Sequence, residues 1–171
     1  MKPKFQQLYK NIAYEVSKMS HARRLQVGAV IVKDDRVISM GYNGMPAGWD
    51  NDCEDRDYMS VDAGAWLDPI EVMERWPFQE DSTAFQIQRR YALKTKPEVL
   101  HAESNAIAKL AKSNDSGLGA DIFITHAPCM ECSKLIFQSG ISRVFYSQNY
   151  RDDSGIKFLK QSGVEVIKHD D

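Results

Sequence analysis

Apolar residues recur at helical spacing near the start of the chain. They stand three or four positions apart and fall on one face of a helix over residues 4–19. The members of this stripe are Phe5, Leu8, Ile12, Val16 and Met19. We expect the helix to pack this face against the core.

The next two patterns are those of strands. β-branched and apolar residues fill 27–32, and a second such run fills 37–42. The polar segment 33–36 between them is short enough for a hairpin turn. Two antiparallel strands are therefore predicted to open a sheet.

Residues 49–97 interrupt this regularity. The segment is acidic at its start and contains all three tryptophans. Asp68, Pro69 and Glu71 have the spacing of a helix N-terminus, and a second helix is predicted over 82–93. The segment is too long for a plain loop. We interpret it as an insertion at about 45–97 that packs over the domain.

Helices and strands alternate in the second half of the chain. Helices are predicted over 100–112, 129–139 and 153–161, and strands over 121–126, 144–147 and 164–167. Strands joined by helices run parallel. The predicted fold is α/β, a three-layer α/β/α sandwich around a mixed five-stranded sheet, with residues 1–171 forming a single domain.

Net charge, apolar content and cysteine count argue against several classes of protein. The 171 residues carry a formal net charge of -2, which argues against a broad nucleic-acid surface. No apolar run suggests a secretory signal or a membrane span, so a cytoplasmic protein is expected. Three cysteines, an odd number, do not make a disulfide framework.

His101, Cys129 and Cys132 are the candidate metal ligands. One imidazole and two thiolates leave the fourth tetrahedral position of a catalytic zinc open for water. A redox Cys-x-x-Cys pair would not need the upstream histidine, and a structural zinc would need a fourth protein ligand. Glu103, two residues after the histidine, can move protons for that water. Cys53 is expected to be a free thiol.

These residues suggest a hydrolytic deamination. Zinc lowers the pKa of a bound water, and Glu103 takes its proton and passes it to a ring nitrogen and a leaving amine. Backbone around Ala102 and Pro128 would form the pocket wall. The pattern His-x-Glu followed by Pro-Cys-x-x-Cys is typical of the zinc nucleobase deaminases.

Several runs resemble the zinc-dependent cytidine and deoxycytidylate deaminase family. They lie at 26–32, 41–46, 101–103, 128–132 and 138–141. The run Gly-Tyr-Asn-Gly-Met-Pro at 41–46 is similar to the deoxycytidylate (dCMP) branch, especially that of bacteriophages. The resemblance implies hydrolysis of dCMP to dUMP and ammonia, which supplies thymidylate synthesis.

The resemblance also implies a nucleotide site. Asn43 would contact the deoxyribose, and Tyr150 would lie beside the nucleotide. Arg24 is the first candidate for the 5′-phosphate, with Arg23 and Arg151 behind it. Gln26, Ala102 and Pro128 complete the predicted substrate-binding set.

Family relatives suggest regulation and assembly. The family is typically homohexameric, activated by dCTP and inhibited by dTTP, with Mg²⁺ assisting the triphosphate. The effector loop would comprise Asn43, Gly44, Met45 and Pro46. One catalytic zinc per chain is expected, and no membrane or nucleic-acid polymer is an expected partner.

Other functions share the zinc pattern. A polynucleotide deaminase of the tRNA adenosine type has the same signature, although the acidic balance and the insertion speak against it. A non-catalytic zinc-binding assembly module would not need Glu103. A deaminase of free nucleosides or of deoxycytidine triphosphate would differ in its pocket residues. Loss of activity when the 5′-phosphate is removed from the substrate would separate a nucleotide deaminase from a nucleoside deaminase.

Overall fold

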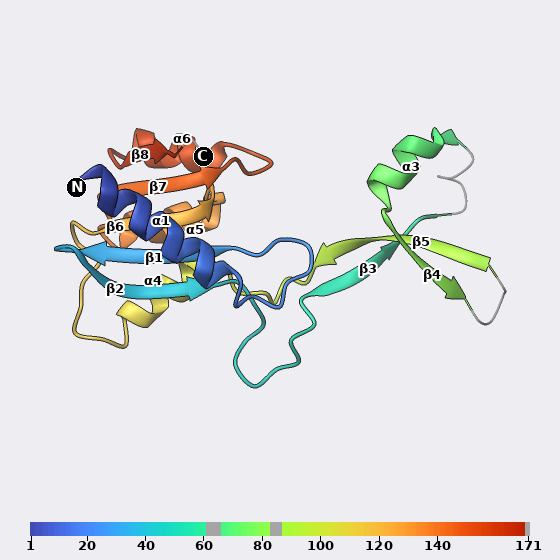
Figure 1. Ribbon diagram of the computed structural model, residues 1–171, viewed down its shortest axis with the longest axis horizontal. Helices are drawn as coiled ribbons and strands as arrows, with labels where there is room; N and C mark the ends of the chain where they lie inside the picture. The colour runs from blue at the N-terminus through green and yellow to red at the C-terminus, as the bar shows by residue number, and fades with distance from the viewer. Residues whose placement is uncertain (61–65, 83–86, 170–171) are drawn as a thin grey trace.

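A computed structural model describes residues 1–60, 66–82 and 87–169, apart from the side chains of residues 82 and 87. The chain forms a sheet covered by helices and an arm that projects from it (Figure 1). Among the described residues, no helix is both long and apolar enough to cross a membrane.

The main sheet has five strands in the order β2-β1-β6-β7-β8. Their bounds are Gly28–Lys33 for β1, Arg36–Tyr42 for β2, Asp121–His126 for β6, Arg143–Gln148 for β7 and Glu165–Lys168 for β8. β1 is antiparallel to both of its neighbours, whereas β6, β7 and β8 are parallel. The predicted mixed sheet is confirmed.

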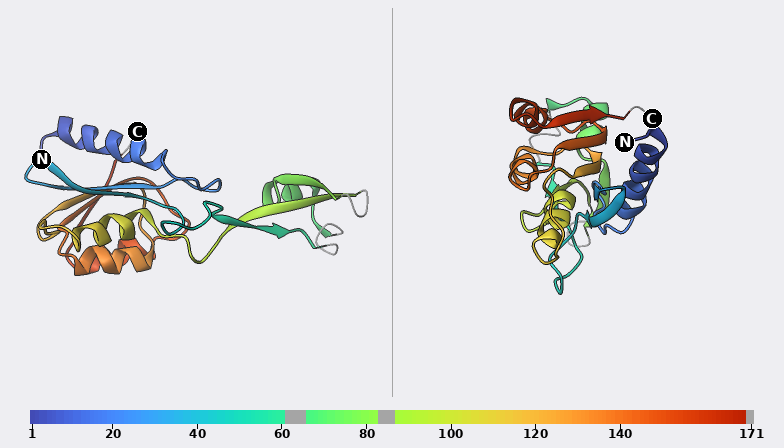
Figure 2. Two further views of the ribbon diagram at one scale, coloured as in Figure 1. Left: turned by 90° about the horizontal axis from the view of Figure 1, so that it is seen from below. Right: turned by 90° about the vertical axis from the view of Figure 1, so that its left-hand side faces the viewer.

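Helices cover both faces of this sheet (Figure 2). One face carries α1, and the other carries α4, α5 and α6. Their bounds are Pro3–Ser17, Ala102–Leu110, Met130–Gln138 and Ser154–Gln161. Alternation along β1 supplies both cores, because Ala29 and Ile31 pack toward α4 while Val30 and Val32 pack toward α1. The three-layer sandwich is confirmed.

The predicted elements outside the insertion all appear, with ends that differ by at most two residues. The hairpin between β1 and β2 turns at Asp34 and Asp35, which have φ values of 51° and 57°. Aspartate tolerates this left-handed region better than most residues. The polar turn expected at 33–36 is therefore present.

The insertion forms a second sheet with the strand order β3-β5-β4. Its strands are β3 (Glu54–Tyr58), β4 (Phe78–Ser82) and β5 (Ile87–Thr95), and its helix is α3 (Pro69–Arg75). Asp68 caps α3 by accepting a hydrogen bond from Ile70 N at 2.7 Å, as the sequence predicts. We name this unit, residues 54–95, the arm.

Two predictions about the arm are wrong. Residues 87–93 of the helix expected over 82–93 lie in strand β5, while residues 83–86 lie outside the described residues. The insertion projects away from the domain instead of packing over it (Figures 1 and 2). Tyr91 explains the strand, because Tyr58 and Phe78 on the flanking strands lie 5.8 and 5.4 Å from its ring. These partners are distant in sequence, so local spacing does not reveal them.

Helix α4 lies unusually close to strand β2. A Cβ atom on Gly41 would lie 2.3 Å from the carbonyl oxygen of Ala102. Ser39 donates a hydrogen bond to Ala106 O at 2.6 Å, and Asn105 donates one to Tyr42 O at 2.8 Å. Together these contacts determine where the first turn of α4 begins.

Gly41→Ala should lower the melting temperature by several degrees, because the added methyl group meets backbone atoms and such overpacking costs about 1–3 kcal/mol. Calorimetry measures the change. Gly44→Ala is the matched control, since a Cβ there meets nothing within 4 Å. An unchanged melting temperature in Gly41→Ala would contradict the close packing of α4 on β2.

Candidate active site

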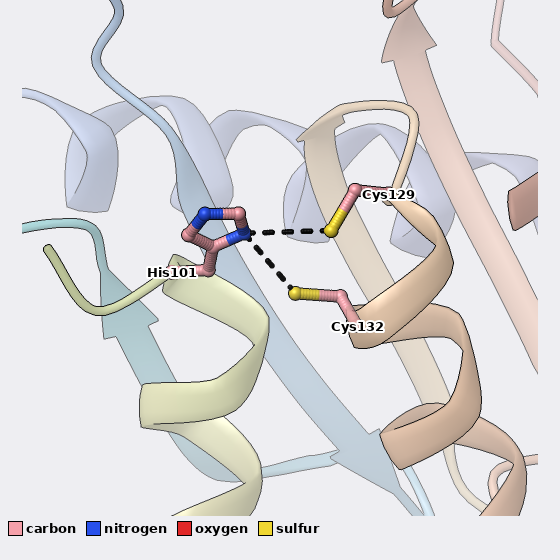
Figure 3. A group of neighbouring side chains, drawn as sticks. All are labelled: His101, Cys129 and Cys132. Atoms are coloured by element: carbon pink, nitrogen blue, oxygen red, sulfur yellow. Dashed lines mark hydrogen bonds between the residues drawn. The ribbon is translucent and has the colours of Figure 1, made fainter. Parts of the chain in front are cut away.

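Three metal-ligating side chains converge from the starts of two helices. His101 is the N-cap residue of α4, one position before the helix and not within its first turn as expected. Cys129 is the N-cap residue of α5, and Cys132 lies in that helix's first turn. His101 Nδ1 lies 3.6 Å from Cys129 Sγ and 3.3 Å from Cys132 Sγ (Figure 3).

The geometry of these ligand atoms fits zinc. All three lie within 4.8 Å of one another. Zinc bonds of about 2.0–2.1 Å to nitrogen and about 2.3 Å to sulfur place tetrahedral ligands roughly 3.5–3.8 Å apart. Across the described part of the chain, no second group of three or more such side chains was found. One nitrogen and two sulfurs leave one coordination position open.

The two cysteines form a coupled pair. A hydrogen bond from Cys132 lowers the pKa of Cys129 to about 4, and a bond with His101 acts in the same direction. The same hydrogen bond and burial raise the pKa of Cys132. One sulfur is thus already a thiolate at neutral pH, and a bound cation favours the second.

Glu103 lies in the first turn of α4 beside this group and is only 4% exposed. Burial raises the pKa of its carboxyl group, and its side chain interacts with Cys132. A carboxyl group in this environment holds a proton more readily than one in water. The arrangement places a proton-accepting group next to the candidate metal ligands.

A cavity of about 560 Å³ opens over Glu103. Most of the residues predicted for the site line it: Arg24, Asn43, His101, Ala102, Glu103, Cys129, Tyr150 and Arg151. Four predicted residues are not among the lining residues: Arg23, Gln26, Pro128 and the buried ligand Cys132. Gln26 instead donates a hydrogen bond to Ser20 O at 2.7 Å, and Pro128 is buried.

The loop predicted to bind effectors lies beside this cavity. Gly44, Met45 and Pro46 are not among its lining residues. Gly44 exchanges backbone hydrogen bonds with Leu100. Met45 packs against a small buried cluster that contains Cys53, whose thiol is free.

Asn43 lines the cavity and also forms hydrogen bonds that hold the neighbouring backbone. Its amide oxygen accepts from Val27 N and its amide nitrogen donates to Leu25 O, both at 2.8 Å. The side chain therefore fixes the segment that precedes β1. The amide nitrogen has a second N–H, for which no acceptor is present among the described residues.

Arg24 brings an available positive charge to the cavity. Its guanidinium donates to the neutral hydroxyl of Thr95 at 3.1 Å. Within the described ranges, no carboxylate forms an ion pair with it. Lys96, also on the cavity wall, is paired with Asp52 at 3.0 Å. Arg24 can therefore meet an anion without first giving up a carboxylate partner.

Sequence reasoning missed several wall residues. Asp57, Lys94 and Thr95 belong to the strands of the arm, which was expected to form no strands, and Lys96 directly follows the arm. His126 also lines the cavity, and burial lowers its pKa. The sequence could have indicated His126 as a wall residue, because it lies at the end of β6, just before the cysteine run.

The sandwich and the ligand set together define a zinc-dependent nucleobase deaminase fold. The family model described as "Cytidine and deoxycytidylate deaminase zinc-binding region" matches residues 3–148. The chain belongs to this family.

Two relatives that cover most of both chains come from phages. The chain is 36% identical to the deoxycytidylate deaminase of Enterobacteria phage T4 over 169 residues, which covers 91% of this chain and 85% of the relative. The phage T2 protein of the same name is 34% identical, with 91% and 87% covered. Among solved structures, the dCMP deaminase of cyanophage S-TIM5 in complex with dCMP and dUMP superposes with a TM-score of 0.74 at 35% identity, covering 99% of each chain.

The metal content of the purified protein tests this site. We expect one zinc per chain, and Cys129→Ala should lose most of it because one of three ligand atoms is removed. Cys53→Ala is the matched control, since that buried thiol lies outside the ligand group. Elemental analysis giving two zincs per chain, or full zinc retention in Cys129→Ala, would contradict the assignment.

Proposed function

We propose that this protein hydrolyses dCMP to dUMP and ammonia, with zinc held by His101, Cys129 and Cys132. The observation that carries the proposal is the buried carboxyl group of Glu103, which lines the cavity together with His101 and Cys129 and interacts with Cys132. The names of the phage T4 relative and of the S-TIM5 structure support the choice of substrate.

In the proposed deamination, the metal would activate water and the chain would transfer protons. Zinc, when bound, acts as a Lewis acid that makes a water molecule nucleophilic near neutral pH. Glu103 accepts a proton from that water and holds it, as its raised pKa allows. The carboxyl group then gives the proton to N3 of the cytosine and assists proton transfer to the amine. The water oxygen becomes the C4 carbonyl of dUMP, and the amine leaves as ammonia.

The remaining wall residues orient the nucleotide. Ala102 is fully buried and lines the cavity beside Glu103, so its backbone can contact the pyrimidine edge, with Pro128 behind it. Asn43 and Tyr150 border the space where the sugar would lie. A nucleotide held at several points keeps its C4 atom close to the reacting groups.

Arg24 is the proposed partner of the 5′-phosphate. A guanidinium can donate two hydrogen bonds to one phosphate, and charge-assisted bonds of this kind are strong. The side chain lines the same cavity as Glu103, and its hydrogen bond to Thr95 uses one N–H. Arg151 lies on the same wall as a second cation.

Further features rest on family resemblance alone. The regulatory predictions are activation by dCTP with Mg²⁺ and inhibition by dTTP. The other predictions are a homohexamer and the supply of dUMP for thymidylate synthesis in the cytoplasm. An effector site at Asn43, Gly44, Met45 and Pro46 belongs with them. Rates measured with each triphosphate, with and without Mg²⁺, would test the regulatory part.

Glu103→Gln should lower kcat by at least about 10²-fold, because the amide cannot accept and return the proton. Zinc content should stay at the wild-type level. Glu131→Gln is the matched control, since that exposed side chain on α5 pairs only with Lys134 among the described residues, at 2.7 Å. Ammonia release from dCMP measures the rate, and full activity in Glu103→Gln would refute the mechanism.

Arg24→Ala should raise KM for dCMP by about 10-fold or more, since hydrogen bonds to charged groups contribute about 1.5–3 kcal/mol. Deoxycytidine, which lacks the phosphate, should be turned over as by the wild type. Arg36→Ala, in the hairpin between β1 and β2, is the control. Equal losses with both substrates would remove Arg24 from phosphate recognition.

A further inference from the structure

A buried carboxylate at the base of the arm holds the segment that carries Arg24. Glu54 is the first residue of β3, and its side chain is only 5% exposed. Its Oε1 atom accepts hydrogen bonds from the backbone N–H groups of Arg23 at 3.0 Å and Arg24 at 3.1 Å. The carboxylate thus binds backbone and forms no ion pair with the Arg24 side chain, which has no carboxylate partner among the described residues.

The last residue of the arm holds the other end of Arg24. Thr95 ends β5 and lies directly opposite Glu54 in the antiparallel pair of β3 and β5. Its hydroxyl accepts the hydrogen bond from Arg24 Nη1 at 3.1 Å. One cross-strand pair therefore fixes Arg24 twice, at its backbone and at its guanidinium.

A third contact joins the same segment to the arm. The Arg23 guanidinium lies 5.8 Å from the centre of the Phe78 ring on β4. All three strands of the arm therefore touch the pair of residues 23–24. Figure 1 shows the arm joined to the rest of the chain at the start of β3 and the end of β5.

The cost of burying Glu54 indicates a role beyond stability. Its second oxygen, Oε2, is buried and has no hydrogen-bond partner among the described residues. Burying a polar atom without a partner costs free energy. Glu54 lies where the arm meets the cavity, next to Arg24, the proposed partner of the 5′-phosphate.

We infer that Glu54 and Thr95 are positioning residues that make the site select a nucleoside 5′-monophosphate over the free nucleoside. Both act by holding Arg24: Glu54 does not line the cavity, and Thr95, on the cavity wall, accepts a hydrogen bond from the Arg24 guanidinium. The inference rests on the proposed function, in which Arg24 binds the 5′-phosphate. It also gives the arm a part in substrate selection, since the arm supplies both residues.

Kinetics with dCMP and deoxycytidine test the inference. Thr95→Val is nearly isosteric and removes only the hydroxyl, and Glu54→Ala removes the acceptor of two backbone N–H groups. Each should raise KM for dCMP by about three- to tenfold, as expected for hydrogen bonds of ordinary strength. The value of kcat for dCMP, and kcat/KM for deoxycytidine, should stay unchanged. Glu54→Gln keeps an acceptor oxygen and should restore a KM close to wild type.

Two comparisons separate positioning from a general loosening of the arm. In an Arg24→Ala background, Thr95→Val should have no further effect on KM, because both act through the same guanidinium. Glu80→Gln alters another arm carboxylate, which accepts from Tyr58 Oη at 2.6 Å and bonds Arg56. That variant should leave both substrates unaffected. An additive double variant, or a raised KM in Glu80→Gln, would overturn the inference.

The possible failures are distinguishable. A wild-type protein that does not turn over dCMP refutes the proposed function itself. A wild type that prefers dCMP, loses that preference in Arg24→Ala and keeps it in Thr95→Val refutes only the positioning role. Should Glu54→Ala fail to fold in a thermal melt, Thr95→Val decides the question alone, because it changes only a partly exposed hydroxyl.

Discussion

The site depends on the convergence of two helix starts on one face of the sheet. His101 and the cysteine pair come from segments that meet only because α4 and α5 pack on the same face. Gly41 permits the close approach of α4 to β2. Small side chains on α4, Ala102 and Ala106, are fully buried against the sheet. Backbone packing thus determines the positions of ligand atoms that must agree within a few tenths of an ångström.

The same packing buries Glu103 and so changes the acidity of its carboxyl group. The helix turn that supplies His101 also buries Glu103, which raises the pKa of its carboxyl group. The hydrogen bond between the cysteines lowers the pKa of Cys129 and raises that of Cys132. Glu103 and Cys132 are buried, whereas Arg24 is an exposed residue that lines the same cavity. A nucleotide fits this polarity, with its base inward and its phosphate outward.

The main domain was predictable because its signals are local. Helical stripes, β-branched runs and the cysteine spacing each lie within a few residues, and they identified the sandwich and the metal group. The arm was not predictable, because Glu54 pairs with Thr95 and Tyr58 with Tyr91 across the whole insertion. Missing those strands also hid the cavity wall at Lys94–Lys96. Asn43 shows a further limit, since no spacing reveals that its amide bonds the backbone of residues 25 and 27.

We propose that this metal site acts on a nucleoside monophosphate. Ammonia and product formation by the zinc-loaded protein should be followed with dCMP, deoxycytidine and an RNA anticodon hairpin in parallel. We expect dUMP and ammonia in equal amounts from dCMP, a lower kcat/KM for deoxycytidine, and no reaction of the hairpin. Conversion of adenosine to inosine in the hairpin, with dCMP left intact, would contradict it.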